Sequence, residues 1–208
     1  MRHGLVGVDA TRFEAAVAGA AEVLETADAR HDDAVYLTYT RRIVELMGGS
    51  GPAVHAAAKE IFDDWSEHHL FTLYDDVPDA LAELRARGFK LGLISNTQRC
   101  LVSFQSHFEL ADLISVAISS STHGFMKPHP SIFRAALDLM AVTADESVMV
   151  GDSLVHDVMG ARGAGMRGVL LARGSKSATV DPDVPVIRSL SELPVLLEAH
   201  AFRASRSD

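Results

Sequence analysis

Cysteine is almost absent from this chain of 208 residues. Cys100 is the single thiol, so the chain cannot form a disulfide with itself, which favours a reducing, cytoplasmic compartment. Long apolar runs are absent too: none approaches the about 20 residues of a membrane-spanning helix, and the N-terminus has no signal-peptide core. These absences exclude a disulfide-stabilised scaffold and predict a soluble protein without a membrane partner.

Positive charge is also scarce, because 19 Lys and Arg face 28 Asp and Glu, for a formal net charge of −9. A protein that binds nucleic acid needs a basic surface, so this balance argues against such a partner. A small anionic substrate is still compatible, since the local field of a site can oppose the global sign. Hydrophobic residues make up 48% of the chain, enough for one domain with an insertion or for two small lobes. The sequence gives no indication of the oligomeric state.

The first part of the chain has the periodicity of helices. Apolar residues recur at helical spacing from about residue 12 to about residue 87. The expected helices contain Phe13 to Leu24, Leu37 to Leu46, Val54 to Trp65 and Pro78 to Leu84. Gly48 and Gly88 are suited to end two of them, because glycine readily adopts the left-handed conformation found after a helix.

After Gly88 the pattern changes to strands that alternate with helices. The expected strands are Leu91–Ile94, Ile114–Ile118, Val148–Val150, Gly168–Leu171 and Val184–Ile187. Helices are expected from Ser131 to Met140 and from Leu190 to Leu197, with polar connections at 119–130 and 175–185. This alternation predicts an α/β fold with a Rossmann-like, doubly wound parallel sheet whose ligand site lies at the carboxyl ends of the strands.

Polar residues follow two of these strand regions. Ser95 and Asn96 end the first strand, and their hydroxyl and amide groups can donate to phosphoryl oxygens without adding charge. Lys127 supplies a compact positive charge for a phosphate or a nucleophilic carboxylate, and Pro128 favours an extended backbone before it. Taken singly, each has a simpler interpretation, because Ser and Asn often end strands and a loop lysine is usually solvated.

Two carboxylates follow the apolar strand 148–150, Asp152 directly after Gly151 and Asp157 five positions later. Two acids at one edge of a sheet are costly neighbours unless a cation holds them. Oxygen-only ligation suits Mg²⁺, which accepts one or two carboxylates together with water and substrate phosphate. The alternative is that Asp152 ends the strand in a turn and Asp157 caps the following helix.

The order of these clusters resembles the haloacid dehalogenase (HAD) superfamily of aspartate-nucleophile hydrolases. Ser95-Asn96-Thr97 matches the second motif of that family, Lys127-Pro128 the third, and the stretch from Gly151 to Asp157 the fourth. The resemblance implies an N-terminal all-helical cap domain over residues 1–75 and an α/β hydrolase core over 76–208. It also implies a Mg²⁺-dependent phosphatase that acts on a small phosphorylated metabolite through an aspartyl-phosphate intermediate.

The same resemblance assigns a role to each site residue. Lys127 is implied as the catalytic cation, Ser95 and Asn96 as the groups that bind the substrate's phosphoryl oxygens, and Asp152 with Asp157 as the ligands of Mg²⁺. Two alternatives remain open: a catalytically inactive binding or regulatory protein of the same fold, and a 2-haloacid dehalogenase, which would need no metal.

The first motif of the family, an apolar strand followed by Asp-x-Asp, is missing. The nearest candidate is Leu5–Val8 with Asp9, but Thr11 stands where the second aspartate belongs. The alternative is that this segment joins two cap helices. A missing central strand removes four or five buried side chains at about 1.5–3 kcal/mol each, comparable to a domain's net stability of about 5–15 kcal/mol. A start assigned too far downstream would explain the loss, and the DNA upstream of Met1 would test this.

Overall fold

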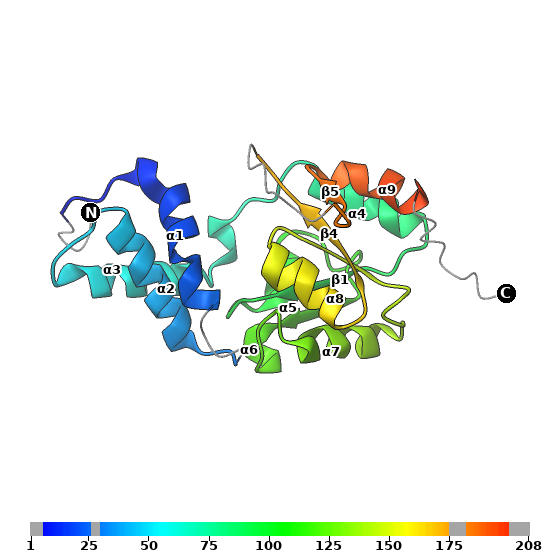
Figure 1. The fold of residues 1–208 in the computed structure, drawn as a ribbon, viewed down its shortest axis with the longest axis horizontal. Coiled ribbons are helices and arrows are strands. Elements are labelled where there is room, and N and C mark those ends of the chain that lie inside the picture. The colour runs from blue at the N-terminus through cyan, green and yellow to red at the C-terminus, as the bar shows by residue number, and fades with distance from the viewer. Residues whose placement is uncertain (1–5, 26–29, 175–181, 200–208) are drawn as a thin grey trace. The chain divides into compact units, whose positions relative to one another are not determined.

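The protein is described by a computed structural model of residues 6–25, 30–174 and 182–199 (Figure 1). The chain divides into two compact units, Met1–Phe71 and Thr72–Asp208. The first is helical and the second combines helices with parallel strands, which confirms the predicted fold class. None of the helices described is both long and apolar enough to span a membrane.

The first unit contains the three long helices that the periodicity predicts: α1 (Phe13–Glu25), α2 (Asp33–Leu46) and α3 (Ala53–Asp64). Two short turns, η1 (Ala10–Arg12) and η2 (His68–Leu70), flank them. Ala16 and Ala20 of α1 pack against Ile43 of α2, and all three are buried. The small alanine side chains let α1 and α2 approach closely, so this pair of helices forms the core of the unit.

Asp9 belongs to this helical unit. Its carboxylate caps η1, where it accepts hydrogen bonds from the backbone N–H of Thr11 (2.9 Å) and from the Thr11 hydroxyl (2.6 Å). Its own backbone N–H donates to the carbonyl of Met47, and Val6 pairs with Ser50. The segment from Val6 to Asp9 is therefore a connection within the helical unit and not a strand of the sheet. Leu5 lies outside the described residues.

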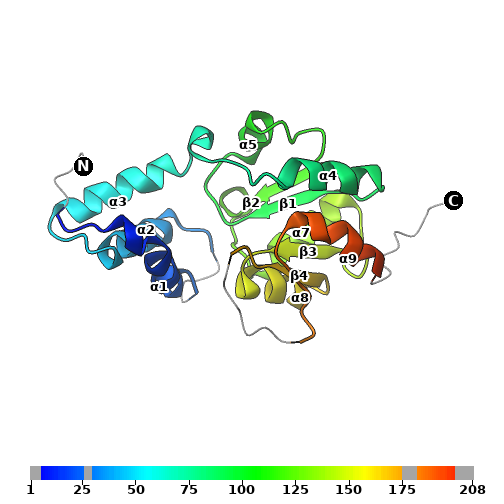
Figure 2. The ribbon, with the colours of Figure 1, turned by 90° about the horizontal axis from the view of Figure 1, so that it is seen from above.

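The second unit alternates helices and strands along the chain. Its elements are α4 (Val77–Ala86), β1 (Gly92–Ser95), α5 (Leu101–His107), β2 (Val116–Ser119), α6 (Ser120–His123), α7 (Pro130–Met140), β3 (Val148–Gly151), η3 (Leu154–Met159), α8 (Gly160–Gly163), β4 (Arg167–Leu171), β5 (Val186–Ile187), η4 (Leu190–Glu192) and α9 (Leu193–Ala199). One hydrophobic cluster joins the strands to α7 and α8, and a second joins them to α4 and α9. Helices therefore cover both faces of the sheet (Figure 2).

The parallel sheet is divided into two parts. β1 pairs with β2, and β4 pairs with both β3 and β5, but no backbone hydrogen bonds join β1 to β3. The apolar residues of β3 are only half-buried, because β4 is its single described neighbour. Ile94 of β1 and Met149 of β3 nevertheless share one hydrophobic cluster.

Some elements differ from the expectation. Helix α5 was not predicted, and β5 is shorter than the expected strand, because only Val186 and Ile187 pair with β4. Val184 packs with Val158 and Leu170. The boundary after residue 75 that the resemblance implies stays a prediction. Tyr74 contacts the second unit, since the guanidinium of Arg173 lies 4.0 Å from the centre of its ring. Most of the expected polar connection 175–185 lies outside the described residues.

Candidate active site at the carboxyl ends of the strands

A buried ion pair lies at the carboxyl ends of the strands. The ammonium of Lys127 lies 2.6 Å from Oδ1 of Asp157 and donates a second hydrogen bond, of 2.9 Å, to the carbonyl of Ile94 in β1. Only 10% of the lysine side chain and 4% of the aspartate side chain are exposed. The pair thus joins the end of β1 to η3, the turn after β3, and brings two of the predicted site residues into direct contact.

The local backbone explains how Asp157 reaches this position. β3 ends at Gly151, and Ser153 caps η3, whose π-helical turn carries Asp157 inward. The backbone N–H of Ser153 donates to Oδ2 of Asp157 at 3.0 Å. A Cβ atom on Gly151 would collide with the Asp157 carboxylate, so only glycine leaves room for it there. Both carboxylate oxygens of Asp157 therefore have a partner in the protein.

Asp152 has a different environment from Asp157. It is the first residue after β3 and is exposed. Among the described residues, its carboxylate has neither a hydrogen-bond donor nor an ion-pair partner. The sequence predicts that both acids hold a cation, and this stays a prediction; among the described residues, Asp157 has protein partners and Asp152 has none.

Asn96 holds the loop that carries Lys127. Its amide nitrogen donates to the carbonyl of Lys127 at 2.9 Å, and its amide oxygen accepts from the N–H of the same residue at 2.7 Å. Ser95, the last residue of β1, lies directly before it and is half-buried. The predicted site residues of β1 thus lie beside the predicted cation, and Asn96 fixes the backbone of that cation.

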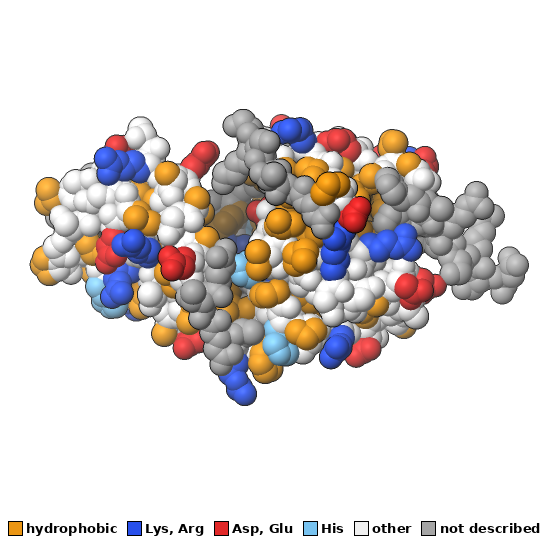
Figure 3. Space-filling model, viewed as in Figure 1, with side chains coloured by type: hydrophobic (Ala, Val, Ile, Leu, Met, Phe, Trp, Pro, Cys, Tyr) orange, Lys and Arg blue, Asp and Glu red, His pale blue; other side chains and the backbone are white. Residues whose placement is uncertain are grey.

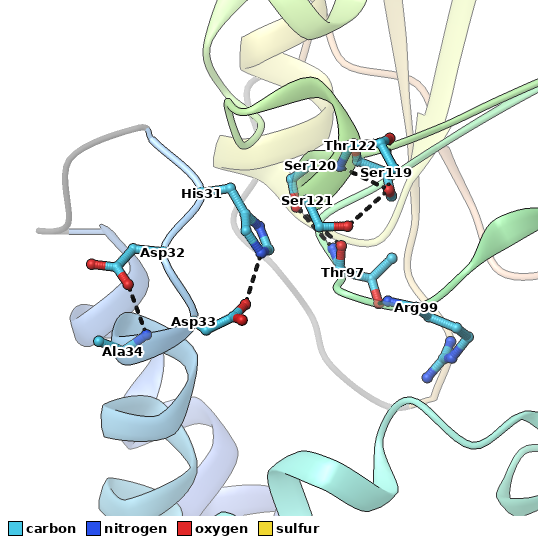
Figure 4. Close-up of polar contacts among 10 residues, drawn as sticks. All are labelled: His31, Asp32, Asp33, Ala34, Thr97, Arg99, Ser119, Ser120, Ser121 and Thr122. Atoms are coloured by element: carbon cyan, nitrogen blue, oxygen red, sulfur yellow. Dashed lines mark hydrogen bonds and ion pairs between the residues drawn. The ribbon is translucent and has the colours of Figure 1, made fainter.

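The turn after β2 also reaches this edge of the sheet, although no sequence pattern marked it as part of the site. Figure 4 shows Thr97 facing the residues from Ser119 to Thr122. The hydroxyl of Ser120 accepts a hydrogen bond of 3.0 Å from the backbone N–H of Thr97. Such a contact depends on how two loops meet in space, so the sequence could not reveal it.

A surface hollow on the outer side of η3 has a different character. It is lined by Pro128, Pro130, Val155, Met159, Gly160 and Gly163. Val155 and Met159 are about half exposed, and Figure 3 shows hydrophobic side chains on this face of the second unit. No charged side chain lines the hollow, so it does not suit a phosphate group and we do not assign the site to it.

A second polar cluster ties together three parts of the second unit. The guanidinium of Arg173, after β4, donates to Asp76 at 2.8 Å and lowers the pKa of that carboxyl to about 2. The Ser189 hydroxyl and the Leu190 N–H also donate to Asp76, at 2.6 and 2.7 Å. The cluster fixes the start of α4 against β4 and η4. Its members are far apart in sequence, and no motif connects them.

Comparison with known proteins identifies the family of this chain. The family model described as haloacid dehalogenase-like hydrolase matches residues 6–165, which is most of the chain. The match includes β1, the Lys127 loop and the turn after β3. The chain therefore belongs to the haloacid dehalogenase-like hydrolases and is a hydrolase by family.

Several curated proteins are similar to this chain. A phosphoserine phosphatase of Thermus thermophilus is 34% identical over 153 residues, 70% of this chain and 59% of that protein. A glyceraldehyde 3-phosphate phosphatase of Pyrococcus furiosus is 34% identical over 135 residues, 62% of this chain and 55% of that protein. Haloacid dehalogenase-like hydrolase domain-containing protein 3 of Danio rerio is 32% identical over 143 residues, 68% and 59% of the two chains. The chain thus spans less than two thirds of the length of these relatives.

Solved structures show the same fold. A HAD phosphatase from Thermococcus onnurineus matches with a TM-score of 0.61 and 27% identity over 85% of this chain and 76% of its own. A magnesium-bound HAD-hydrolase from Bacillus subtilis matches with a TM-score of 0.71 over 90% of this chain and 81% of its own, at 19% identity. The second likeness concerns the fold alone.

Proposed function

We propose that this protein is a Mg²⁺-dependent phosphatase that acts on a small phosphorylated metabolite. The observation that carries the proposal is the buried Lys127–Asp157 pair at the strand ends together with the exposed carboxylate of Asp152, which has no partner among the residues that the structure describes. A fixed cation next to an available acid suits phosphoryl transfer, in which positioning and charge stabilisation supply most of the catalysis. The similarity to two proteins named as phosphatases supports this reaction over dehalogenation.

The residues of the chain divide the work as follows. Lys127 offsets negative charge on the phosphoryl group, and Asp157 keeps its ammonium in place by the 2.6 Å contact. Ser95 offers a hydroxyl to the phosphoryl oxygens, since no described residue occupies its side chain. Asn96 binds the same group in this proposal and, through its two bonds to the backbone, also orients Lys127.

The donor set at this edge fits magnesium. The described residues contain no group of three or more His, Cys, Asp and Glu that could hold a metal, so a closed protein cage is not formed there. Mg²⁺ needs no such cage, because it commonly binds through one or two carboxylates, water and substrate phosphate. Asp152 would hold the Mg²⁺ ion, and Asp157 would lie next to that ion. When bound, the cation would neutralise charge on the phosphoryl group.

The proposed mechanism assigns no residue as the group that attacks phosphorus. The family's reaction needs an aspartate that forms a covalent bond to phosphorus. Among the described residues, Asp157 is the only carboxylate in contact with Lys127, and its oxygens are already bonded. Asp9 is committed to the cap of η1. This observation favours a second candidate, a HAD-fold protein that binds phosphorylated ligands without turning them over.

Hydrolysis of a generic aryl phosphate, measured with and without Mg²⁺, tests the first proposal. Turnover that disappears on chelation and returns with Mg²⁺ would support a phosphatase. Magnesium-dependent binding of inorganic phosphate without turnover would support the second candidate. Release of halide from a 2-haloacid in the presence of chelator would instead identify a dehalogenase and overturn both.

A further inference from the structure

Four consecutive hydroxyl residues, Ser119 to Thr122, form the turn from the last residue of β2 into α6. Ser119 and Ser120 are buried, with exposed fractions of 2% and 0%, whereas Ser121 and Thr122 are exposed. A buried hydroxyl must find partners, because an unpaired polar group inside a protein is costly. The hydrogen-bond partners of the Ser120 hydroxyl therefore indicate its role.

Two of those partners are the backbone groups of one residue, Thr97. The N–H of Thr97 donates to the Ser120 hydroxyl at 3.0 Å, and the hydroxyl lies 3.4 Å from the carbonyl of Thr97, to which it donates (Figure 4). The backbone N–H of Ser121 adds a third contact, of 3.3 Å, to the same carbonyl. The turn thus holds the loop after β1 by its backbone, at the residue that follows Asn96.

On its other side the same loop holds Lys127. The Asn96 amide bonds both the N–H and the carbonyl of Lys127, and the lysine ammonium bonds Asp157. A continuous series of contacts therefore runs from Ser120 through Thr97 and Asn96 to the buried ion pair. Displacement of the first member should move the others, because Asn96 and Thr97 are adjacent in the chain and the remaining links are hydrogen bonds.

We propose that Ser120 is a positioning residue of the candidate site: it fixes the loop of Ser95, Asn96 and Thr97 and, through Asn96, the backbone of Lys127. The proposal rests on the proposed function in that the positioned groups bind phosphoryl oxygens. Ser120 itself does not touch the ligand. Reacting groups need close alignment, and a misplacement of about 1 Å can reduce a rate by about a hundredfold.

Hydrogen exchange of single backbone amides in the full chain, followed by NMR, tests this role. The replacement is Ser120→Ala, and the matched control is Ser121→Ala in the same turn, whose hydroxyl bonds Ser119 and not Thr97. Exchange at Thr97 should accelerate in Ser120→Ala because its acceptor is lost. The decisive amide is that of Lys127, which bonds Asn96 and does not contact Ser120. It should exchange at least about fivefold faster in Ser120→Ala than in the control.

Unchanged exchange at Lys127 in a folded Ser120→Ala variant would overturn the proposal. If that variant does not fold, Ser120→Cys retains a small side chain with a weaker acceptor, and the same acceleration at Lys127 is expected. Binding of inorganic phosphate with Mg²⁺ gives a separate readout, for which we expect a dissociation constant about tenfold higher in Ser120→Ala than in the control. Equal phosphate affinity of these two variants would count against the positioning role. Absence of phosphate binding by the unmodified chain would overturn the proposed function while the exchange result still decides the role of Ser120.

Discussion

The ammonium of Lys127 and the carboxylate of Asp157 lie 2.6 Å apart, and both side chains are almost fully buried. A buried ion pair adds little net stability compared with an apolar pair, but removal of one partner leaves an uncompensated charge in the interior. The pair is thus a poor device for stability alone. The pair lies at the carboxyl ends of parallel strands, where ligands bind in this class of fold. This position favours a role in which Asp157 holds the Lys127 ammonium in place for a ligand.

Asp157→Asn should destabilise the protein by about 3 kcal/mol or more, because Lys127 then keeps its buried charge without a partner. The free energy of unfolding, measured by urea denaturation at neutral pH, checks this. The matched control is Asp152→Asn at the exposed acid nearby, which should change the free energy by no more than about 0.5 kcal/mol. Equal effects of the two replacements would contradict the asymmetry between these carboxylates.

Asp152→Ala should have the opposite effect, a loss of function with little change in stability. It should abolish Mg²⁺-dependent binding or turnover of phosphate and leave the thermal midpoint nearly unchanged, since the side chain is exposed and has no partner among the described residues. Phosphate binding with and without Mg²⁺ and a thermal unfolding curve test both parts. Asp145→Ala is the control, because Asp145 is also exposed but precedes β3 and so lies at its opposite end. Unchanged magnesium dependence in Asp152→Ala would refute the metal assignment.

Gly151→Ala should disrupt the site by a steric clash. A Cβ at this position would overlap the Asp157 carboxylate, so either the ion pair or the end of β3 must move. We expect a loss of stability of about 2 kcal/mol or more, of the size seen when a core position is overpacked. Gly163→Ala is the control, since a Cβ at that position would have no neighbour within 4 Å and alanine favours a helix. That change should be neutral or stabilising, and a similar loss for both would contradict the steric argument.

Asp76 predicts a pH dependence of stability. Its pKa is lowered from 3.8 to about 2, first by the hydrogen bond from Arg173. A carboxyl with a lowered pKa stabilises the folded state above its unfolded pKa, and this contribution is lost as the pH falls from about 4 towards 2. Asp76→Asn should therefore lower the free energy of unfolding by up to about 2 kcal/mol at pH 7, and the difference from the unmodified chain should shrink below pH 4.

Denaturation curves at several pH values measure this effect. Asp9→Asn serves as the control, because the Asp9 carboxyl also has a lowered pKa but its side chain is 47% exposed to solvent. It should change stability little at any pH. A constant difference between Asp76→Asn and the unmodified chain from pH 7 to pH 2 would show that the hydrogen bonds of Asp76 do not depend on its charge.

Much of the architecture was open to prediction from the sequence. The apolar runs at 148–150 and 168–171 and the helical spacing in α1 and α3 are local signals, and the structure confirms each element. Helix α5 was missed because it is short and buries only Leu101 and Gln105, a pair without a clear apolar stripe. The convergence of Asn96, Lys127 and Asp157 followed from a general property of parallel sheets, whose strand ends share one edge.

The pairing within the site could not be predicted in the same way. The spacing of the two aspartates does not show that the π-helical turn η3 carries Asp157 into the interior and leaves Asp152 outside. The contacts of Asn96 with Lys127 and of Ser120 with Thr97 join loops more than 20 residues apart in sequence. Such contacts depend on the path of each loop, which no local pattern records.

The edges of β1 and β3 that pair with no described strand give a last prediction. An apolar strand-forming peptide that ends in Asp-x-Asp, added in trans, should bind between these edges, because each can accept a further strand and the apolar residues of β3 are only half-buried. Binding should raise the thermal midpoint, by an amount that grows with the logarithm of peptide concentration above the dissociation constant, and should bring a carboxylate to the edge where Lys127 lies. Magnesium-dependent turnover of an aryl phosphate should then appear or increase. The same peptide with a central proline is the control, since proline cannot donate within a central strand. Equal effects of both peptides, or of neither, would show that these edges do not accept a strand.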